Sequence, residues 1–122
     1  MRALIVDDSR AIRGIIKKIL GEIGFEVVEA GHGVEALRCL QEAQNFDVML
    51  VDWNMPEMNG YDFLCKVRAN PSYKGVPLMM VTSETELSQM TKALEAGANE
   101  YVMKPFTKEV IADKLALLGV LP

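Results

Sequence analysis

The sequence predicts an α/β fold in which helices cover both faces of a parallel sheet. Short apolar runs alternate with segments of helical periodicity along the whole chain. Glycine, proline or asparagine residues stand at most of the boundaries between these segments. Strands that alternate with helices through short connections form parallel sheets, because each helix returns the chain to the edge from which the previous strand began.

The predicted strands are short and apolar, and the third is apolar on both faces, as a central parallel strand should be. They cover residues 4–6, 26–30, 47–52, 77–81 and 100–103. The first helix is predicted from the stripe Ile12, Ile15, Ile16, Ile19, Leu20 and Ile23, and Gly24 ends it. The other predicted helices cover residues 34–43, 61–69, 85–96 and 108–118.

Five strand–helix units are arranged most economically in the doubly wound strand order 2-1-3-4-5. This order places the first and third strands side by side. The 122 residues suit one domain over residues 1–122. The net charge of −4, without a run of Lys or Arg, argues against nucleic-acid binding.

The sequence also predicts a soluble, monomeric protein of the cytoplasm. The N-terminus becomes acidic at Asp7, too soon for a signal peptide. The apolar runs fall far short of the roughly 20 residues that a membrane span needs. Cys39 and Cys65 lack metal-site spacing and are expected to be reduced thiols.

Polar residues stand at the carboxyl ends of four predicted strands. Asp7 and Asp8 follow the first strand, Asp52 ends the third, Thr82 follows the fourth and Lys104 follows the fifth. Ligands bind at this edge of open α/β sheets. Taken singly, each residue also has a plain structural interpretation: a helix cap for Asp8 and Thr82, a turn for Asp52, and a solvated side chain for Lys104.

Taken together, the three acids are too close for those interpretations. If they lie within about 5 Å, each pair repels by roughly 3 kcal/mol at an effective dielectric of 20. Protons or a cation must then occupy the cluster, and hard oxygen ligands suit Mg²⁺. A carboxylate, a cation, a hydroxyl and a lysine suit phosphoryl transfer. Asp52 would attack phosphorus, while Thr82 and Lys104 would bind phosphoryl oxygens.

These residues resemble the receiver domain of two-component response regulators, over the whole chain. The matching motifs are Asp7-Asp8, Asp52-Trp53-Asn54-Met55-Pro56 with Gly60, Val81-Thr82-Ser83, and residues 93–106. The resemblance is to stand-alone receivers of the chemotaxis type. It implies a flavodoxin-like three-layer sandwich, so it supplies the strand order 2-1-3-4-5 as well.

The resemblance also implies a phosphoryl-accepting site. A phosphohistidine kinase would donate to Asp52. Mg²⁺ would be held by Asp8, Asp52 and the backbone carbonyl of Asn54, with Asp7 acting through water. The Lys104–Pro105 peptide bond would be cis. Receivers catalyse only their own phosphorylation and dephosphorylation, so we do not expect an enzyme.

The family further implies a conformational switch. Phosphorylation would draw Thr82 toward the site, and Tyr101 would rotate into the space that it leaves. The face made by the fourth helix, fifth strand and fifth helix would then change its affinity for a protein partner. Asn54 and Glu84 would tune the lifetime of the acyl phosphate. Together with Trp53 they favour the chemotaxis type, with a flagellar motor switch as one possible partner.

Several alternatives stay open at this point. Within the family, the chain could be a phosphate sink, a phosphorelay intermediate, an unphosphorylated scaffold or a part of a longer regulator, although no linker follows the last helix. A haloacid-dehalogenase-like phosphatase would need a second acid where Asn54 stands. An FMN-binding flavodoxin is opposed by Asp7 and Asp8, which would repel a phosphate. His32 is expected in a solvated loop, and Met79 and Met80 in the core.

Overall fold

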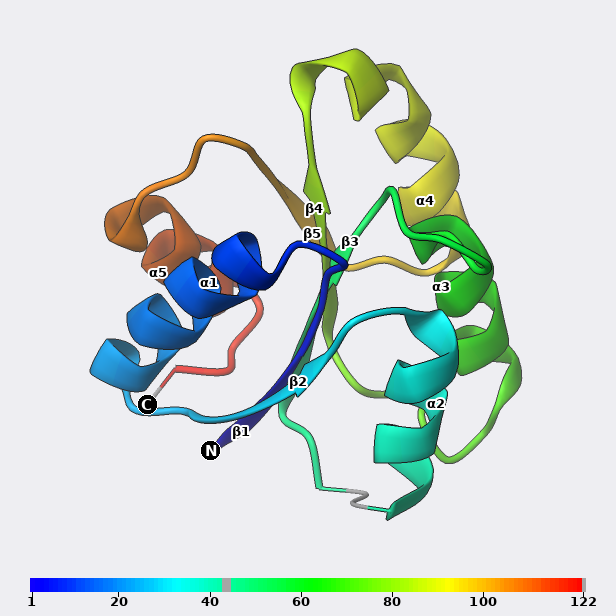
Figure 1. The fold of residues 1–122 in the computed structure, drawn as a ribbon, viewed down its shortest axis with the longest axis horizontal. Helices are drawn as coiled ribbons and strands as arrows, with labels where there is room; N and C mark the ends of the chain where they lie inside the picture. The colour runs from blue at the N-terminus through cyan, green and yellow to red at the C-terminus, as the bar shows by residue number, and fades with distance from the viewer. Residues whose placement is uncertain (43–44, 122) are drawn as a thin grey trace.

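The computed structural model describes residues 1–42 and 45–121, apart from the side chains of Glu84 and Thr85. Within these residues, five parallel strands form one sheet in the order β2-β1-β3-β4-β5, as predicted (Figure 1). The strands are β1 (Arg2–Val6), β2 (Glu26–Ala30), β3 (Val48–Asp52), β4 (Leu78–Thr82) and β5 (Glu100–Met103). The predicted parallel α/β fold is therefore confirmed.

Helices cover the sheet on both sides, which makes three layers. In Figure 1, α1 and α5 lie on one face of the sheet, and α2, α3 and α4 lie on the other. The helices are α1 (Arg10–Ile23), α2 (Gly33–Glu42), α3 (Gly60–Ala69), α4 (Met90–Ala96) and α5 (Lys108–Leu117). The predicted end of the second helix at residue 43 lies outside the described residues.

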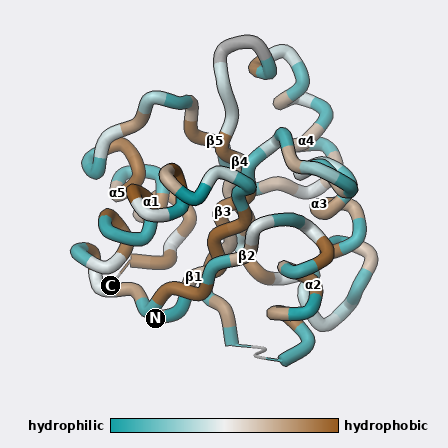
Figure 2. Tube along the Cα trace, viewed as in Figure 1, coloured by the Kyte–Doolittle hydropathy of each residue, from teal (hydrophilic) through white to brown (hydrophobic). Residues whose placement is uncertain are grey.

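Two apolar cores follow from the alternation of side chains along the strands. Leu4 and Val6 of β1 belong to the core beneath α2, α3 and α4, whereas Ala3 and Ile5 belong to the core beneath α1 and α5. All five residues of β3 are buried, because this strand is covered on both faces. Figure 2 shows the central strands as the hydrophobic interior of the fold.

Side-chain caps fix where several helices begin. Ser9 Oγ accepts a hydrogen bond from the Ile12 amide at 3.2 Å, which makes Ser9 the cap of α1. Asn59 and Thr107 cap α3 and α5 in the same way. Since Ser9 is the cap, Asp8 is not, and the plain structural interpretation of Asp8 is wrong.

The register brings the strand ends to a common edge. Val6 pairs with Val51, Asp52 with Val81, and Thr82 with Met103. The residues that follow β1, end β3 and β4, and follow β5 therefore meet at the carboxyl edge, as the sequence predicted. Asp52 ends β3, as predicted, whereas Thr82, which was predicted to follow the fourth strand, is the last residue of β4.

The fourth helical segment differs from the prediction of one helix over residues 85–96. It begins as a 3₁₀ helix, η1 (Glu84–Gln89), and becomes α-helical only at Met90. The side chain of Glu86 accepts hydrogen bonds from the Ser83 amide at 3.1 Å and from its hydroxyl at 2.8 Å. Serine and threonine are poor in helix interiors, because their hydroxyl groups compete for backbone partners. Local capping therefore tightens this turn.

Three smaller expectations can also be compared with the structure. The Lys104–Pro105 peptide bond is cis, as the resemblance implied. His32 is not simply solvated, because its Nδ1 accepts a hydrogen bond from the Glu35 amide at 3.2 Å in the first turn of α2. Met79 and Met80 are fully buried, as expected. No described helix is long and apolar enough to span a membrane.

Candidate functional site

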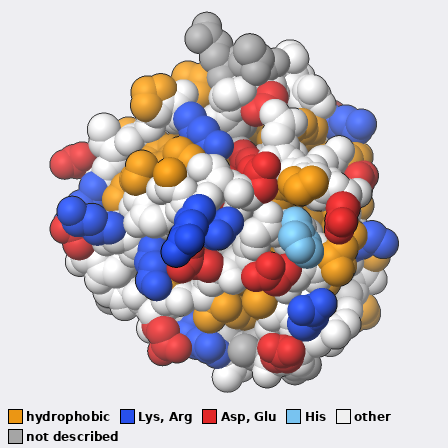
Figure 3. All heavy atoms as spheres, viewed as in Figure 1, with side chains coloured by type: hydrophobic (Ala, Val, Ile, Leu, Met, Phe, Trp, Pro, Cys, Tyr) orange, Lys and Arg blue, Asp and Glu red, His pale blue; other side chains and the backbone are white. Residues whose placement is uncertain are grey.

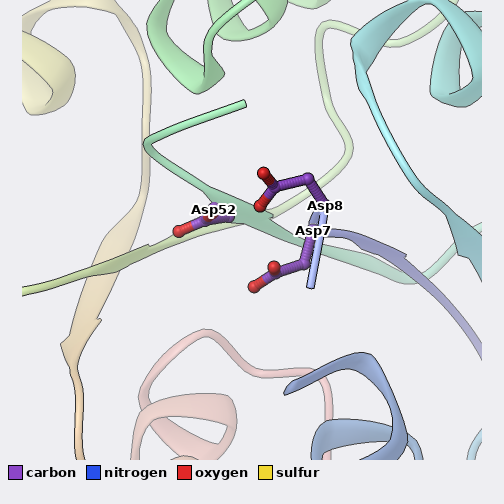
Figure 4. Close-up of side chains that lie close together, drawn as sticks. All are labelled: Asp7, Asp8 and Asp52. Carbon is purple, nitrogen blue, oxygen red and sulfur yellow. The ribbon is translucent and has the colours of Figure 1, made fainter. Parts of the chain in front are cut away.

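The three predicted acids meet at the carboxyl edge of the sheet. Asp7 and Asp8 follow β1, and Asp52 is the last residue of the neighbouring strand β3. One carboxylate oxygen from each residue lies within 4.8 Å of the others. Figure 4 shows the three side chains reaching into the same space beyond the two strand ends. The short separation between the three carboxylates that the strand order predicted is therefore confirmed.

Burial of these acids falls from the inside of the site to its mouth. Asp7 is 1 % exposed and Asp52 is 6 % exposed, whereas Asp8 is exposed. Buried carboxylates are unfavourable unless they are paired or hydrogen-bonded. The inner pair therefore needs a cation, while Asp8 can keep water at the open side.

Lys104 is the cation that the fold supplies. Its Nζ lies 3.2 Å from Asp52 Oδ1 and 3.6 Å from Asp7 Oδ2. Its backbone amide donates a hydrogen bond to the Thr82 carbonyl oxygen at 2.7 Å, which continues the pairing of β4 with β5 past the strand ends. The position of Lys104 thus follows from the sheet, and one ammonium group serves two buried carboxylates.

The pKa values of these groups reflect this imbalance. The pKa of Asp52 is raised from 3.8 to about 6, chiefly by burial and next by the charge of Asp7, while Lys104 opposes the rise. Burial also raises the pKa of Asp7, although a hydrogen bond from the Ser9 amide and the charge of Lys104 lower it. For Lys104, burial lowers the pKa, but attraction to Asp52 and Asp7 outweighs it and the pKa is raised. One lysine does not neutralise the cluster.

The cluster fits a hard divalent cation such as Mg²⁺. All of its side-chain ligands are carboxylate oxygens, which Mg²⁺ prefers, and exposed Asp8 leaves room for water ligands. Asp7 Oδ1 accepts a hydrogen bond from the Ser9 amide at 2.8 Å. Asp7 Oδ2 is buried and has no hydrogen-bond partner among the described residues, although Lys104 lies near it. A cation at this place would satisfy that oxygen.

Thr82 lies at the same edge and is fully buried. Its hydroxyl donates a hydrogen bond to the Ser83 carbonyl oxygen at 3.2 Å. The N-cap of η1 is Ser83, so the interpretation of Thr82 as a helix cap is wrong. Thr82 therefore carries a hydroxyl group at the end of β4 without serving a cap.

Glycine at position 60 brings the start of α3 against the end of β3. The Gly60 amide donates a hydrogen bond to the Trp53 carbonyl oxygen at 2.8 Å. A Cβ atom at position 60 would clash with the carbonyl oxygen of Asp52 and would stand 3.0 Å from Met80 Cε. The close approach therefore requires glycine, which explains why Gly60 accompanies the Asp52 motif.

Trp53 directly follows Asp52, whereas Tyr101 lies on β5, two strands away from β3 in the sheet. Trp53 follows Asp52 and is 6 % exposed, with its ring centroid 5.9 Å from that of Tyr61. Tyr101 of β5 is half-buried, and Lys114 Nζ lies 5.3 Å from the centre of its ring. The roles of Tyr101 as a switch and of Asn54 as a carbonyl ligand stay predictions.

Glu84 belongs to η1, but its side chain lies outside the described residues, so its tuning role also stays a prediction.

Sequence reasoning missed one residue at the site. Arg13 reaches from α1 to the backbone of Asp7, with its Nη1 donating to the Asp7 carbonyl oxygen at 2.6 Å. The available signal was a basic residue one turn into the helix that follows the paired acids.

Residues 3–116 match the family described as the response regulator receiver domain. The chain belongs to this family. The receiver is 46 % identical over 119 residues to chemotaxis protein CheY1 of Helicobacter pylori strain J99, covering 97 % of this chain and 96 % of that protein. It is also 46 % identical over 116 residues to chemotaxis protein CheY of Pseudomonas aeruginosa, covering 94 % and 93 %. It is a receiver domain closely related to the chemotaxis CheY proteins.

Solved structures agree with the receiver fold. Vibrio cholerae chemotaxis protein CheY4 superposes with a TM-score of 0.88 at 38 % identity, covering 95 % of this chain and 96 % of that one. A receiver domain of a sensor histidine kinase from Pseudomonas aeruginosa, with a magnesium ion in its active-site cleft, gives a TM-score of 0.85 at 26 % identity, covering 95 % and 94 %. The family assignment decides against the phosphatase and flavodoxin alternatives.

Proposed function

We propose that this receiver accepts a phosphoryl group from a histidine kinase onto Asp52, with Mg²⁺ bound, and signals to a protein partner in a chemotaxis pathway. The observation that carries the proposal is Asp52 itself. It is a buried carboxylate at a strand end, with Lys104 Nζ at 3.2 Å and two further acids within 4.8 Å. The names of its relatives support the chemotaxis pathway.

Asp52 is suited to act as the nucleophile. Its pKa of about 6 leaves it mostly ionised near neutral pH, and burial makes its carboxylate a poorly solvated base. One carboxylate oxygen forms a bond to phosphorus while the bond from phosphorus to the donor histidine nitrogen breaks. The electron pair of that bond stays on the nitrogen, and Asp52 becomes an acyl phosphate.

The neighbouring side chains would position and neutralise the phosphoryl group. Asp7, Asp8 and Asp52, with the carbonyl of Asn54, would hold Mg²⁺, which supplies positive charge to the phosphoryl oxygens when bound. Lys104 would move from its shared position between Asp52 and Asp7 to pair with one phosphoryl oxygen. Thr82 would exchange its 3.2 Å bond to the Ser83 carbonyl for another phosphoryl oxygen.

The kinase would approach over a pocket beside Lys104. This pocket, about 290 Å³ in volume, is lined by Ile12, Ile15, Lys104, Pro105 and Phe106. Ile15 is 51 % exposed although it is a large apolar residue. Figure 3 shows hydrophobic side chains gathered over the α1 and α5 side, bordered by Lys and Arg. Because Lys104 lines the pocket and contacts Asp52, a donor seated there would meet the acceptor.

The output partner would bind the face formed by α4, β5 and α5. Large apolar side chains are exposed on all three elements, namely Leu94 on α4, Met103 on β5 and Val110 on α5. Large apolar side chains that are exposed to solvent favour a protein partner. Tyr101 lies on β5 within this face and would couple it to Thr82. A component of the flagellar motor switch is the partner that the chemotaxis relationship favours.

The test uses Trp53, which follows the acceptor and is the only tryptophan of the chain. Mg²⁺ with acetyl phosphate should change the fluorescence of Trp53 and add one phosphoryl group by intact mass, with acetate as the leaving group. Mg²⁺ with beryllofluoride, a non-covalent phosphoryl mimic, should give the fluorescence change alone. Asp52→Asn should abolish both responses, whereas Asp62→Asn, an exposed acid in the first turn of α3, should retain them. A normal mass shift in Asp52→Asn would contradict the proposal.

A further inference from the structure

Arg13 ties α1 to the loop that carries two of the three acids. Its Nη1 donates to the carbonyl oxygen of Asp7 at 2.6 Å, and its Nε donates to Glu29 Oε1 of β2 at 3.3 Å. The side chain is only 18 % exposed, although it belongs to a helix at the surface. A charged donor at this distance makes a strong hydrogen bond, so Arg13 is a fixed contact of the site.

The carbonyl that Arg13 holds belongs to the peptide unit between Asp7 and Asp8. A peptide unit is planar, so fixing its oxygen also fixes the direction in which the chain enters Asp8. The rest of the Asp7 residue is held independently, since its amide donates to the Ala30 carbonyl oxygen at 3.1 Å and its Oδ1 accepts from the Ser9 amide at 2.8 Å. Arg13 therefore controls the orientation of the exposed acid, Asp8.

The guanidinium group is needed for this geometry. It donates through Nη1 to a carbonyl oxygen and through Nε to a carboxylate at the same time, whereas an ammonium group has no such planar fork. Glu29 offsets part of the positive charge of Arg13, and its Oε2 also lies 3.4 Å from Lys17 Nζ. The contact with β2 therefore helps to hold Arg13 without involving the carboxylate of any of the three acids.

We propose that Arg13 is a positioning residue for divalent-cation binding, holding the Asp7–Asp8 peptide so that the Asp8 carboxylate converges with those of Asp7 and Asp52. The inference rests on the proposed function, in which these acids bind Mg²⁺. It goes further by assigning the metal-binding geometry to a residue outside the cluster. Hydrogen-bonding partners behind metal ligands typically change metal affinity by about 10- to 100-fold.

The sign of the effect separates positioning from electrostatics. Removing a positive charge near three carboxylates makes the site more negative, so Coulomb attraction alone predicts tighter Mg²⁺ binding by an Arg13→Met variant. Loss of positioning predicts weaker binding. A purely structural role would lower thermal stability, and it would leave the affinity of the folded variant equal to or tighter than that of the wild type.

The experiment measures Mg²⁺ affinity through Trp53 fluorescence in the wild type, Arg13→Met, Arg13→Lys and Glu29→Gln. We expect Arg13→Met to bind Mg²⁺ about tenfold more weakly. Arg13→Lys keeps the charge but loses the fork, and should also bind more weakly. Glu29→Gln keeps an acceptor for Arg13 Nε and should stay within about twofold of the wild type. Saturating Mg²⁺ should restore phosphorylation by acetyl phosphate in both Arg13 variants.

A second readout uses the metal-free protein. The amide resonances of Asp8 and Ser9 in ¹H–¹⁵N spectra should shift strongly in Arg13→Met and little in Glu29→Gln. Equal or tighter Mg²⁺ binding by Arg13→Met would overturn the inference, and if that variant does not fold, wild-type affinity in Arg13→Lys would overturn it instead. Failure of the wild type to bind Mg²⁺ would overturn the proposed function, and this inference with it.

Discussion

Two long basic side chains, Arg68 and Lys104, lie at opposite edges of the sheet and have opposite surroundings. At the amino edge, Arg68 donates to the Gly97 carbonyl oxygen at 2.8 Å and to Asn99 Oδ1 at 2.8 Å. Its Nη1 also donates to two further backbone carbonyl oxygens, each at 3.1 Å. At the carboxyl edge, Lys104 is shared between two buried carboxylates with a third acid nearby.

The difference separates stability from function. Arg68 meets neutral acceptors, and one of them, Asn99 Oδ1, also accepts from the Leu78 amide at the start of β4. This edge is held by complementary groups. The carboxyl edge instead concentrates negative charge that one lysine does not balance, so the metal-free protein is destabilised there. Sites that bind charged ligands commonly give up stability in this way.

The largest effect should come from removing Arg68. Arg68→Met removes the four hydrogen bonds that this side chain donates, and we expect a loss of about 4 kcal/mol in the free energy of unfolding. Urea denaturation measures the loss. Arg38→Met, which replaces an exposed arginine on α2, is the matched control and should change stability by less than about 0.5 kcal/mol. A loss as small as that of the control would break the comparison.

Removing the charge of Asp52 should have the opposite sign. Asp52→Asn removes a buried charge that the folded state disfavours, and without Mg²⁺ it should raise the free energy of unfolding at pH 7 by about 3 kcal/mol. Asp113→Asn, an exposed acid on α5, is the control and should have little effect. A destabilised Asp52→Asn variant would show that the acid cluster is not under electrostatic strain.

The pH dependence of this gain follows from the raised pKa of Asp52. Between its ordinary value of 3.8 and about 6, the folded state binds a proton that the unfolded state has released, so wild-type stability falls as pH rises. The gain from Asp52→Asn should be near zero below pH 4, grow up to about pH 6, and stay constant above it. Urea denaturation at several pH values measures it, and a gain independent of pH would contradict the assignment.

The smallest expected effect concerns the contact between α3 and α4 behind Trp53. Lys92 Nζ lies 4.3 Å from the centre of the Tyr61 ring, and Tyr61 packs on Trp53. Lys92→Met should lower the free energy of unfolding by about 0.5 kcal/mol, because cation–π contacts near the surface are weak. Lys74→Met serves as the control at an exposed turn. A loss above about 2 kcal/mol would contradict this prediction, because it would show that the contact between α3 and α4 affects stability about as strongly as the two sheet edges do.

The residues at the carboxyl edge could be predicted from the sequence because each polar site residue stands at the end of an apolar strand. Asp52, Thr82 and Lys104 each stand where an apolar run stops, and parallel strands bring their carboxyl ends together. The hydrophobic stripe of α1 and the glycine at its end likewise fixed a helix that the structure confirms. These are local signals, which a single sequence carries well.

The contacts of Arg13 and Arg68 could not be predicted in that way. Each side chain reaches a backbone carbonyl oxygen outside its own helix, and that contact does not depend on which side chain the partner residue carries. Carbonyl oxygens are present at every residue, so the sequence does not indicate which one an arginine will meet. The 3₁₀ turn of η1 was missed for a different reason. Ser83 and Glu86 have the spacing of a capping box, which marks where a helical segment begins but does not tell whether its first turn is 3₁₀ or α.

The hydrogen bond from the Lys104 amide to the Thr82 carbonyl oxygen, at 2.7 Å, has a mechanical consequence. Thr82 and Lys104 would each sense the phosphoryl group through a side chain, yet their backbones are joined. A displacement of Thr82 toward the phosphoryl group would therefore also displace the backbone of Lys104, because the two backbones share this hydrogen bond. Movements of the two residues would therefore be coupled, and the movement would extend to β5, the strand that carries Tyr101.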